Sequence, residues 1–309
     1  MASEPLVVTC GVATVERADS VRSSVLSAYW TLTKPEINFL IALSTGAAFC
    51  IGWAEPLARF PWELLVNTVL GTVLVASGAA ILNQLIERQF DAQMRRTGRR
   101  PIAAGHIGPI HALVFGTLLS LVGGIYLAMA VRPAASLLAV LTLISYLFLY
   151  TPLKRRTPVC TLVGAFPGAM PVLIGYVAAA GKLDSPAWIL YAILFLWQFP
   201  HFMAITWMYR EDYARAGYVV LPHGRKKALF MGLQSVFPAL ALVCVTIMAL
   251  VLRHAGEVIT VGTMLLDLSF LYFAVRLAIV QSNSAARRLL LASVVYLPLV
   301  LVLQVLARF

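Results

Sequence analysis

The sequence predicts an all-α, polytopic membrane protein with nine transmembrane helices. Hydrophobic residues make up 61% of the 309 residues and charged residues only 12%, about half the charged share of a typical soluble domain. The apolar residues form long runs of about 18 to 25 residues, enough to cross a hydrocarbon core of about 30 Å. A soluble fold is excluded, because it could not bury this much apolar surface.

The predicted spans follow one another with short connections. They cover residues 36–54, 62–86, 109–130, 134–152, 159–180, 187–208, 228–252, 258–281 and 289–307. No connection is long enough for a separate soluble domain, so we expect residues 1–309 to form a single transmembrane domain. Residues 1–30 mix acidic and basic side chains without an apolar core, which predicts a flexible tail and neither a signal peptide nor a transit peptide.

Basic residues are concentrated in alternate connections. Of the 24 Lys and Arg residues, 18 lie on the side of the N-terminus, and five lie in the connections of the other side. The positive-inside rule therefore places the N-terminus and the basic loops in the cytoplasm. We expect a bacterial inner (plasma) membrane, because the tail lacks transit character. The net charge of +11 suits anionic membrane lipid and an anionic substrate, and nucleic acid is not an expected partner.

The second span runs into a short ladder of polar side chains. Asn83, Glu87 and Asp91 are spaced four residues apart, so at about 100° per residue they share one helix face. Two carboxylates and an amide offer the oxygen ligands that Mg²⁺ prefers, with coordination positions left for water and phosphate oxygens. The ladder therefore predicts a magnesium site at the basic side of the membrane.

Four arginines follow the ladder, among them Arg96 and Arg100. Guanidinium groups there can neutralise the oxygens of a diphosphate with bidentate geometry. The alternative is an ordinary interfacial loop, in which Glu87 and Asp91 pair with nearby arginines at helical spacing. Asn83 argues against that alternative, because it places a third polar ligand one turn deeper on the same face.

A second acidic segment follows the sixth span and is less complete than the first. It offers Asp212, whereas Glu211 points from another face. His201 precedes Asp212 by eleven residues, so on a continuous helix the two side chains would share a face about 16 Å apart. Pro200 leaves the continuity of that helix open, and a histidine at such a position can also be an ordinary packed core residue.

Two further sets of charged residues stand beside or inside spans. Lys154 and Arg155 follow the fourth span and are either a basic flank of the membrane or diphosphate contacts. Asp267 and Arg276 lie in the eighth span, nine residues apart. This spacing puts them about 180° apart on a helix, so each must find its partner on another element.

Five local strings resemble the UbiA-type intramembrane prenyltransferases and are most similar to the heme O synthase (protoheme IX farnesyltransferase) branch. They occur in order over about 190 residues, at Leu32–Pro35, Glu87–Pro101, Tyr150–Thr157, Gly164–Gly175 and Trp197–Gly217. The sequence departs from the wider superfamily at Gln84, where an aspartate is common. It also departs at Tyr218–Val220, which puts the fine shape of the second acidic loop in question.

The resemblance implies a helical bundle around a central cavity, with Mg²⁺ as cofactor. It implies transfer of the farnesyl group of farnesyl diphosphate to the 2-vinyl group of heme B, with water addition, giving heme O and diphosphate. Metal binding and catalysis fall to Asn83, Glu87, Asp91 and Asp212, diphosphate binding to Arg96, Arg100, Lys154 and Arg155, and heme binding to His201. A heme A synthase or a cytochrome oxidase assembly factor is the expected protein partner.

Two other functions fit parts of the pattern. A prenyltransferase for an aromatic quinone precursor would share the diphosphate site but would need a polar pocket for a phenolic acid. A secondary transporter would need broken helices with ligands near the middle of the membrane, whereas the acidic residues of this sequence lie at one face.

Overall fold

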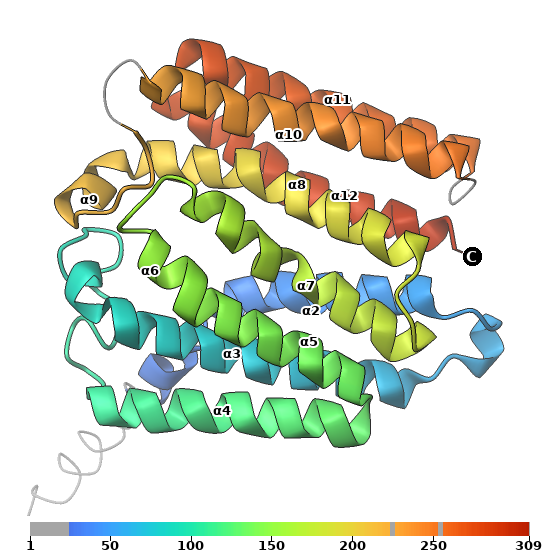
Figure 1. Cartoon of the computed structure of the whole chain (residues 1–309), viewed down its shortest axis with the longest axis horizontal. Coiled ribbons are helices and arrows are strands. Elements are labelled where there is room, and N and C mark those ends of the chain that lie inside the picture. The colour runs from blue at the N-terminus through green and yellow to red at the C-terminus, as the bar shows by residue number, and fades with distance from the viewer. Residues whose placement is uncertain (1–24, 223–225, 253–255, 309) are drawn as a thin grey trace, which may run out of the picture.

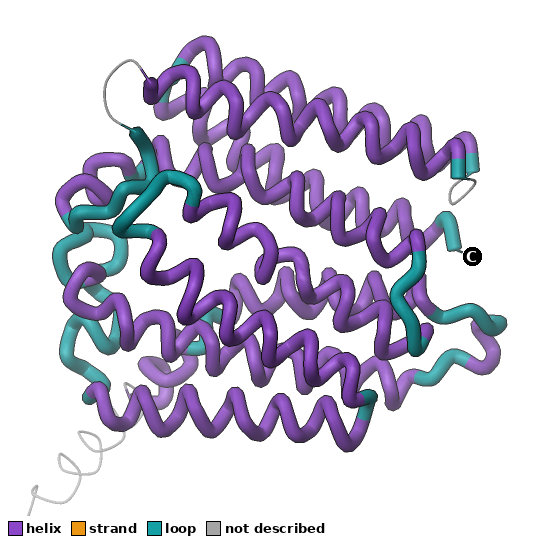
Figure 2. Tube along the Cα trace, viewed as in Figure 1, coloured by secondary structure: helices purple, strands orange, loops and turns teal. Residues whose placement is uncertain are grey.

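The computed structural model describes residues 25–222, 226–252 and 256–308, which form helices and no strand (Figures 1 and 2). Nine helices in this part are long and apolar enough to span a membrane, which confirms the predicted fold class. They are α2 (Pro35–Gly52), α3 (Trp62–Asp91), α4 (Pro109–Ala130), α5 (Pro133–Ile144) with its extension, α7 (Cys160–Ala180), α8 (Ser185–Met208), α10 (Lys226–Val251), α11 (Glu257–Val280) and α12 (Asn283–Leu306). The extension of α5 is a π-helical segment, η2 (Ser145–Tyr150), followed by α6 (Thr151–Leu153).

The helix boundaries differ from the prediction at three places. Helix α3 continues to Asp91, so the polar ladder belongs to the spanning helix itself. Helix α12 begins at Asn283 because the Ser282 side chain accepts a hydrogen bond from the Ala285 N–H and caps the helix. Residues 25–32, the last part of the predicted tail and the two residues after it, are helical, and residues 1–24 lie outside the described residues.

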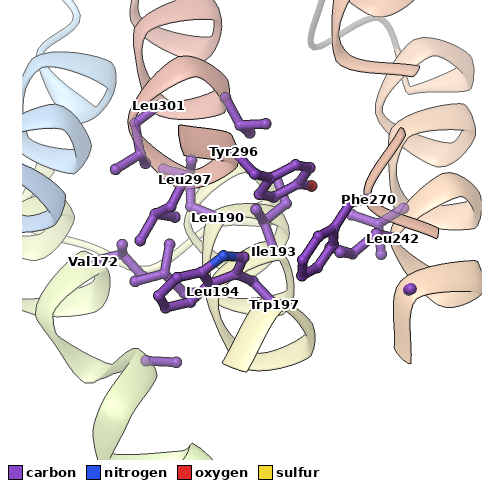
Figure 3. Close-up of a cluster of buried hydrophobic side chains, with 14 of the residues drawn as sticks. Val172, Leu190, Ile193, Leu194, Trp197, Leu242, Phe270, Tyr296, Leu297 and Leu301 are labelled. Carbon is purple, nitrogen blue, oxygen red and sulfur yellow. The ribbon is translucent and has the colours of Figure 1, made fainter. Parts of the chain in front are cut away.

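The apolar core lies between α7, α8, α10, α11 and α12. Figure 3 shows Trp197 and Leu194 of α8 close to Leu297 of α12, with Phe270 of α11 facing Tyr296. Phe270 and Tyr296 stack with ring centroids 4.8 Å apart. These contacts are made by side chains on opposing helices, so the pairing of the helices depends on shape rather than on hydrophobicity alone.

Close packing of α7 against α2 depends on small residues. A Cβ at Gly175 would collide with the backbone oxygen of Thr45, and a Cβ at Gly52 would come within 2.9 Å of the backbone oxygen of Tyr176. Glycine at both positions therefore lets the two helix backbones approach each other. This contact fixes α2, and with it the segment that precedes α2, relative to the centre of the bundle.

The structure identifies the partners of Asp267, which is fully buried in α11. The hydroxyl groups of Thr246 in α10 and Tyr296 in α12 donate to its two carboxylate oxygens at 2.5 and 2.6 Å. Asp267 thus connects three helices, as its predicted dependence on other elements requires. Arg276 is exposed one turn before the end of α11, where a long side chain can reach the membrane surface.

One end of the bundle carries most of the polar side chains discussed below. In Figure 1 the C-terminal end of α3, α6 and the short helix α9 (Arg210–Arg215) lie together at the left end of the molecule. We call this the basic end and define it by these three elements and residues 92–108, 154–159 and 216–222. The other end carries η1 (Leu57–Arg59) and the connection from α7 to α8.

Candidate active site

The two predicted acidic segments meet at the basic end, although 116 residues separate the contacting positions. The backbone N–H of Arg96 donates to Asp212 Oδ2 at 3.1 Å. The Arg96 guanidinium also donates to the Tyr213 hydroxyl at 3.3 Å and lies 4.8 Å from the centroid of the Tyr209 ring. The loop after α3 and helix α9 therefore form one site.

Glu87 is the centre of the ladder and is only 5% exposed. Both of its carboxylate oxygens accept hydrogen bonds from the Lys154 ammonium, at 2.9 and 3.1 Å. Burial acts to lower the pKa of Lys154, but the charge of Glu87 outweighs it and holds that pKa well above its usual value. Lys154 therefore carries a positive charge inside the site at neutral pH.

Asp91 ends α3 with one carboxylate oxygen paired and the other unpaired. Arg100 Nη1 donates to Oδ2 at 2.7 Å, while Oδ1 is buried without any hydrogen-bond partner in the described part of the chain. The Thr97 hydroxyl donates to the Asp91 backbone oxygen at 3.0 Å and holds the loop against the helix. A buried carboxylate oxygen without a donor has the chemistry of a cation ligand.

Asn83 connects the ladder to the π-helical segment of the fourth span. Its amide donates to the Thr151 hydroxyl at 3.0 Å, and its Oδ1 accepts from the Tyr146 hydroxyl at 3.3 Å. A π-helix often occurs at a functional site, and here it directs Tyr146 toward the ladder. Asn83 is thus held in a fixed orientation between two helices.

The residues fit a magnesium–diphosphate complex better than a bare metal ion. Asp212 is already engaged, because Arg215 donates to its Oδ1 at 3.1 Å and the Arg96 N–H reaches its Oδ2. Among the residues that the structure describes, no three His, Cys, Asp or Glu side chains lie close enough to hold a metal together. The oxygen donors suit Mg²⁺, which retains several waters and shares its coordination with phosphate oxygens.

The four predicted diphosphate-binding residues are arranged in two ways. Lys154 and Arg100 contact the carboxylates of the ladder. Arg96 lies over Tyr209, and the Arg155 guanidinium lies 4.0 Å from the centroid of the Phe90 ring. The guanidinium groups of Arg96 and Arg155 thus lie on aromatic faces and form no ion pair with a carboxylate of the described residues.

The simpler alternative, in which Glu87 and Asp91 form local helical ion pairs, is wrong. Glu87 and Asp91 pair with Lys154 and Arg100, which are not at helical spacing from them. Arg88, a candidate for a local pair, donates instead to the Leu85 backbone oxygen at 2.9 Å. The ladder is therefore assembled by tertiary contacts.

Two residues of the site were not among the predicted site residues. The Lys34 ammonium interacts electrostatically with Glu87 and Asp91; burial, followed by the positive charges of Arg100 and Lys154, lowers the pKa of Lys34 to about 7. The sequence signals for Lys34 are its place directly before the first span and its place in Leu32–Pro35, one of the five strings that resemble the family.

Tyr218 is the other such residue. Its ring packs against Phe90 at 6.0 Å and Tyr213 at 5.9 Å. Its hydroxyl is buried beside Glu87, and burial followed by the charge of Glu87 raises the pKa of Tyr218. The sequence marks this position only as a departure from related sequences. Tyr218 thus closes the second loop over Glu87.

His201 does not share a helix with Asp212, which corrects that prediction. Helix α8 ends at Met208, and Tyr209 has φ −109° and ψ 20°, outside the helical region, before α9 begins. His201 Nδ1 instead lies 2.7 Å from the Ser293 hydroxyl of α12, and its ring stacks on Trp197. Within the described part of the chain its Nε2 makes no hydrogen bond.

Two cavities between helices lie away from these residues. One of about 300 Å³ lies between α8 and α10. Another of about 680 Å³ is lined by α11 and α12, with Arg288 among its lining residues. Neither is lined by a predicted site residue.

Comparison with known proteins gives consistent similarities. The UbiA prenyltransferase family matches residues 39–297. The chain is 46% identical to a protoheme IX farnesyltransferase of Solibacter usitatus over 286 residues, covering 91% of this chain and 98% of that protein. It is 39% identical to one of Koribacter versatilis, covering 93% of this chain and 94% of that protein.

Solved structures show the same fold at low sequence identity. A structure described as that of digeranylgeranylglyceryl phosphate synthase in membranes has a TM-score of 0.74 at 17% identity, covering 92% of this chain and 99% of that one. A UbiA homolog from Archaeoglobus fulgidus bound to GPP and Mg²⁺ has a TM-score of 0.64 at 14% identity, covering 89% of this chain and 99% of that one.

Proposed function

The chain belongs to the UbiA prenyltransferase family, and from this premise we propose that it transfers the farnesyl group of farnesyl diphosphate to the 2-vinyl group of heme B. Water adds in the same reaction, so that heme O and diphosphate are the products. The chain is a multi-pass membrane protein and a prenyltransferase. The choice of heme as acceptor rests on relatives named protoheme IX farnesyltransferase.

One observation supports the diphosphate chemistry most directly: the two acidic segments and several basic side chains lie together at the basic end. Glu87 and Asp91 each form an ion pair shorter than 3 Å with a basic side chain. The loop that contains Arg100 also binds Asp212. Such a cluster can exchange its internal ion pairs for contacts with a phosphorylated ligand. We assign Arg96, Arg100, Lys154 and Arg155 to the diphosphate.

Magnesium is the proposed cofactor, held by Asn83, Glu87, Asp91 and Asp212 together with diphosphate oxygens. The unpaired Asp91 Oδ1 supports this assignment, and a fold neighbour was determined with GPP and Mg²⁺ bound. Bound Mg²⁺ would neutralise charge on the leaving diphosphate.

Lys154 and Arg100 stabilise the charge that grows on the diphosphate as the bond between its oxygen and farnesyl C1 breaks. C1 then bonds to the terminal vinyl carbon of heme B, and water adds its oxygen to the other vinyl carbon and releases a proton. Phe90, Tyr213 and Tyr218, whose rings pack together, exclude water from the allylic cation until the carbon–carbon bond forms.

We keep His201 as the proposed heme contact, either as an iron ligand or at a propionate. Its Nδ1 is oriented by Ser293, which leaves Nε2 as the atom that would face the heme. Replacing His201 by Ala should raise the KM for heme B and leave the KM for farnesyl diphosphate unchanged. An equal rise in both Michaelis constants would contradict a heme contact.

The proposed location is a bacterial inner membrane with the basic end in the cytoplasm, as the distribution of Lys and Arg indicates. Surrounding lipid is then the medium from which both apolar substrates enter. A heme A synthase or a cytochrome oxidase assembly factor as acceptor of the product stays a prediction.

The test is an incubation of membranes containing the protein with farnesyl diphosphate, Mg²⁺ and heme B, followed by mass analysis of the heme. We expect the mass gain of farnesyl plus hydroxyl for the wild type and its loss for Asp91→Ala and Asp212→Ala. Glu211→Ala is the matched control, because the Glu211 side chain is 81% exposed beside Asp212. Prenylation of a phenolic acid without reaction on heme would establish the quinone-precursor alternative instead.

A further inference from the structure

Lys34 is a basic residue of the active site that forms no ion pair with a carboxylate of the described residues. The charges acting on it are those of Arg100, Lys154, Glu87 and Asp91. Arg100 and Lys154 are each paired with a carboxylate of the ladder, whereas none of the ion pairs in the described part of the chain includes Lys34. Three basic side chains therefore face two carboxylates, and Lys34 is the one without a carboxylate partner.

The backbone at Lys34 is held in a conformation that side chains rarely adopt. Its φ of 53° and ψ of 65° are left-handed, which is uncommon for any residue but glycine and is found where the surroundings impose it. Lys34 also precedes Pro35, and such a residue strongly favours extended backbone. The surroundings must therefore hold the backbone at Lys34 in this conformation.

Two buried amides on neighbouring helices bind the backbone directly before Lys34. Gln84 of α3, 2% exposed, donates from Nε2 to the Leu32 backbone oxygen at 2.8 Å. Asn38 of α2, 7% exposed, donates to the Thr33 backbone oxygen at 2.8 Å and to the Ser77 hydroxyl at 2.7 Å. The carbonyl groups of the two residues before Lys34 are thus each fixed by a side-chain donor.

Resting on the function proposed above, we propose that Gln84 is a positioning residue: through the Leu32 carbonyl it holds Lys34 over the ladder, where the Lys34 ammonium binds the diphosphate of the substrate. Gln84 lies between Asn83 and Glu87 in sequence but faces away from the ladder, toward Leu32. It therefore acts on the diphosphate through the chain segment rather than by contact. Its neutral amide also adds no charge to a site in which Lys34 must stay unpaired.

The lowered pKa of Lys34 is consistent with a position close to Arg100 and Lys154. The pKa of Lys34 is about 7 because of burial and of the neighbouring Arg100 and Lys154 charges. An incoming diphosphate reverses that repulsion, since it brings negative charge to the three cations at once. Lys34, which has no carboxylate partner among the described residues, is therefore free to bind the diphosphate.

The test is binding of inorganic diphosphate to the purified full-length protein by calorimetry, with EDTA and again with Mg²⁺. The variants are Gln84→Met, which keeps the side-chain length but loses the donor, Lys34→Met, and the double variant. We expect both single variants to weaken diphosphate binding about tenfold, as for the loss of one charge-assisted contact. The double variant should bind no more weakly than Lys34→Met alone.

The control is Gln198→Met. Gln198 is also buried and donates to a carbonyl oxygen of another helix, Ala165 at 3.1 Å, and to its own helix at 3.1 Å, so it matches the packing cost of losing Gln84. It should leave diphosphate binding unchanged. Effects of Gln84→Met and Lys34→Met that multiply in the double variant, or a Gln84→Met that binds like wild type, would overturn the inference. A wild type that does not bind diphosphate would instead refute the proposed function.

Discussion

Removal of Lys154 should destabilise the protein more than any surface charge change, because it leaves the buried Glu87 carboxylate without its ion-pair partner. The two side chains are 15% and 7% exposed, and two hydrogen bonds of 2.9 and 3.1 Å join them. Breaking a buried ion pair from one side costs about 3–5 kcal/mol. At the lower limit, appropriate to the partial exposure of Lys154, we expect Lys154→Met to lower the free energy of unfolding by about 3 kcal/mol.

The double variant Glu87→Gln/Lys154→Met should recover most of this stability, since no buried charge is left without a partner. We expect a coupling free energy of at least about 2 kcal/mol from the double-mutant cycle. The assay is reversible unfolding in detergent micelles, with kcat/KM for farnesyl diphosphate measured in parallel. Activity should stay lost in the stable double variant, because the diphosphate has lost its cation and its metal ligand.

The matched control is the pair of Lys182 and Asp184 at the other end of the bundle. Its atoms are 3.4 Å apart, but the side chains are 73% and 35% exposed, so its coupling should stay below about 1 kcal/mol. A coupling for Glu87 and Lys154 no larger than this control would refute the reasoning that the pair is desolvated. Recovery of activity in the double variant would show that the pair serves the fold alone.

Four further outcomes are expected. Gly175→Ala should destabilise by about 2 kcal/mol or more in detergent unfolding, because its Cβ would collide with Thr45, whereas Gly46→Ala, whose nearest neighbour is 3.9 Å away, should be tolerated. Because the pKa of Lys34 is lowered to about 7, the site loses a positive charge above that pH; diphosphate affinity should fall by up to about tenfold per pH unit there, and a profile as flat as that of Lys34→Arg would contradict this. The same ionisation should raise the free energy of unfolding between pH 7 and the usual lysine pKa, since the unfolded chain then binds the extra proton. Asp267→Ala leaves two buried hydroxyl groups without their acceptor and should cost about 2–4 kcal/mol, with an unchanged KM for farnesyl diphosphate; a changed KM would place Asp267 in the site.

Local periodicity was sufficient for one face of the active site. Asn83, Glu87 and Asp91 were placed together because helical spacing needs no knowledge of other elements, and α3 carries all three in a buried position. The prediction for His201 and Asp212 used the same argument and was wrong. It required an unbroken helix, and the chain leaves the helical region at Tyr209.

The sequence by itself determined the membrane class and the nine spans, because each apolar run is long enough to cross the bilayer on its own. It also determined that acidic and basic side chains gather at one end. Only the tertiary structure decided which charges meet: Lys154 with Glu87, Arg100 with Asp91, and Lys34 with neither. These choices depend on how α2, α3 and the fourth span pack, and helix packing in a membrane follows shape and small residues such as Gly175, which hydropathy does not encode.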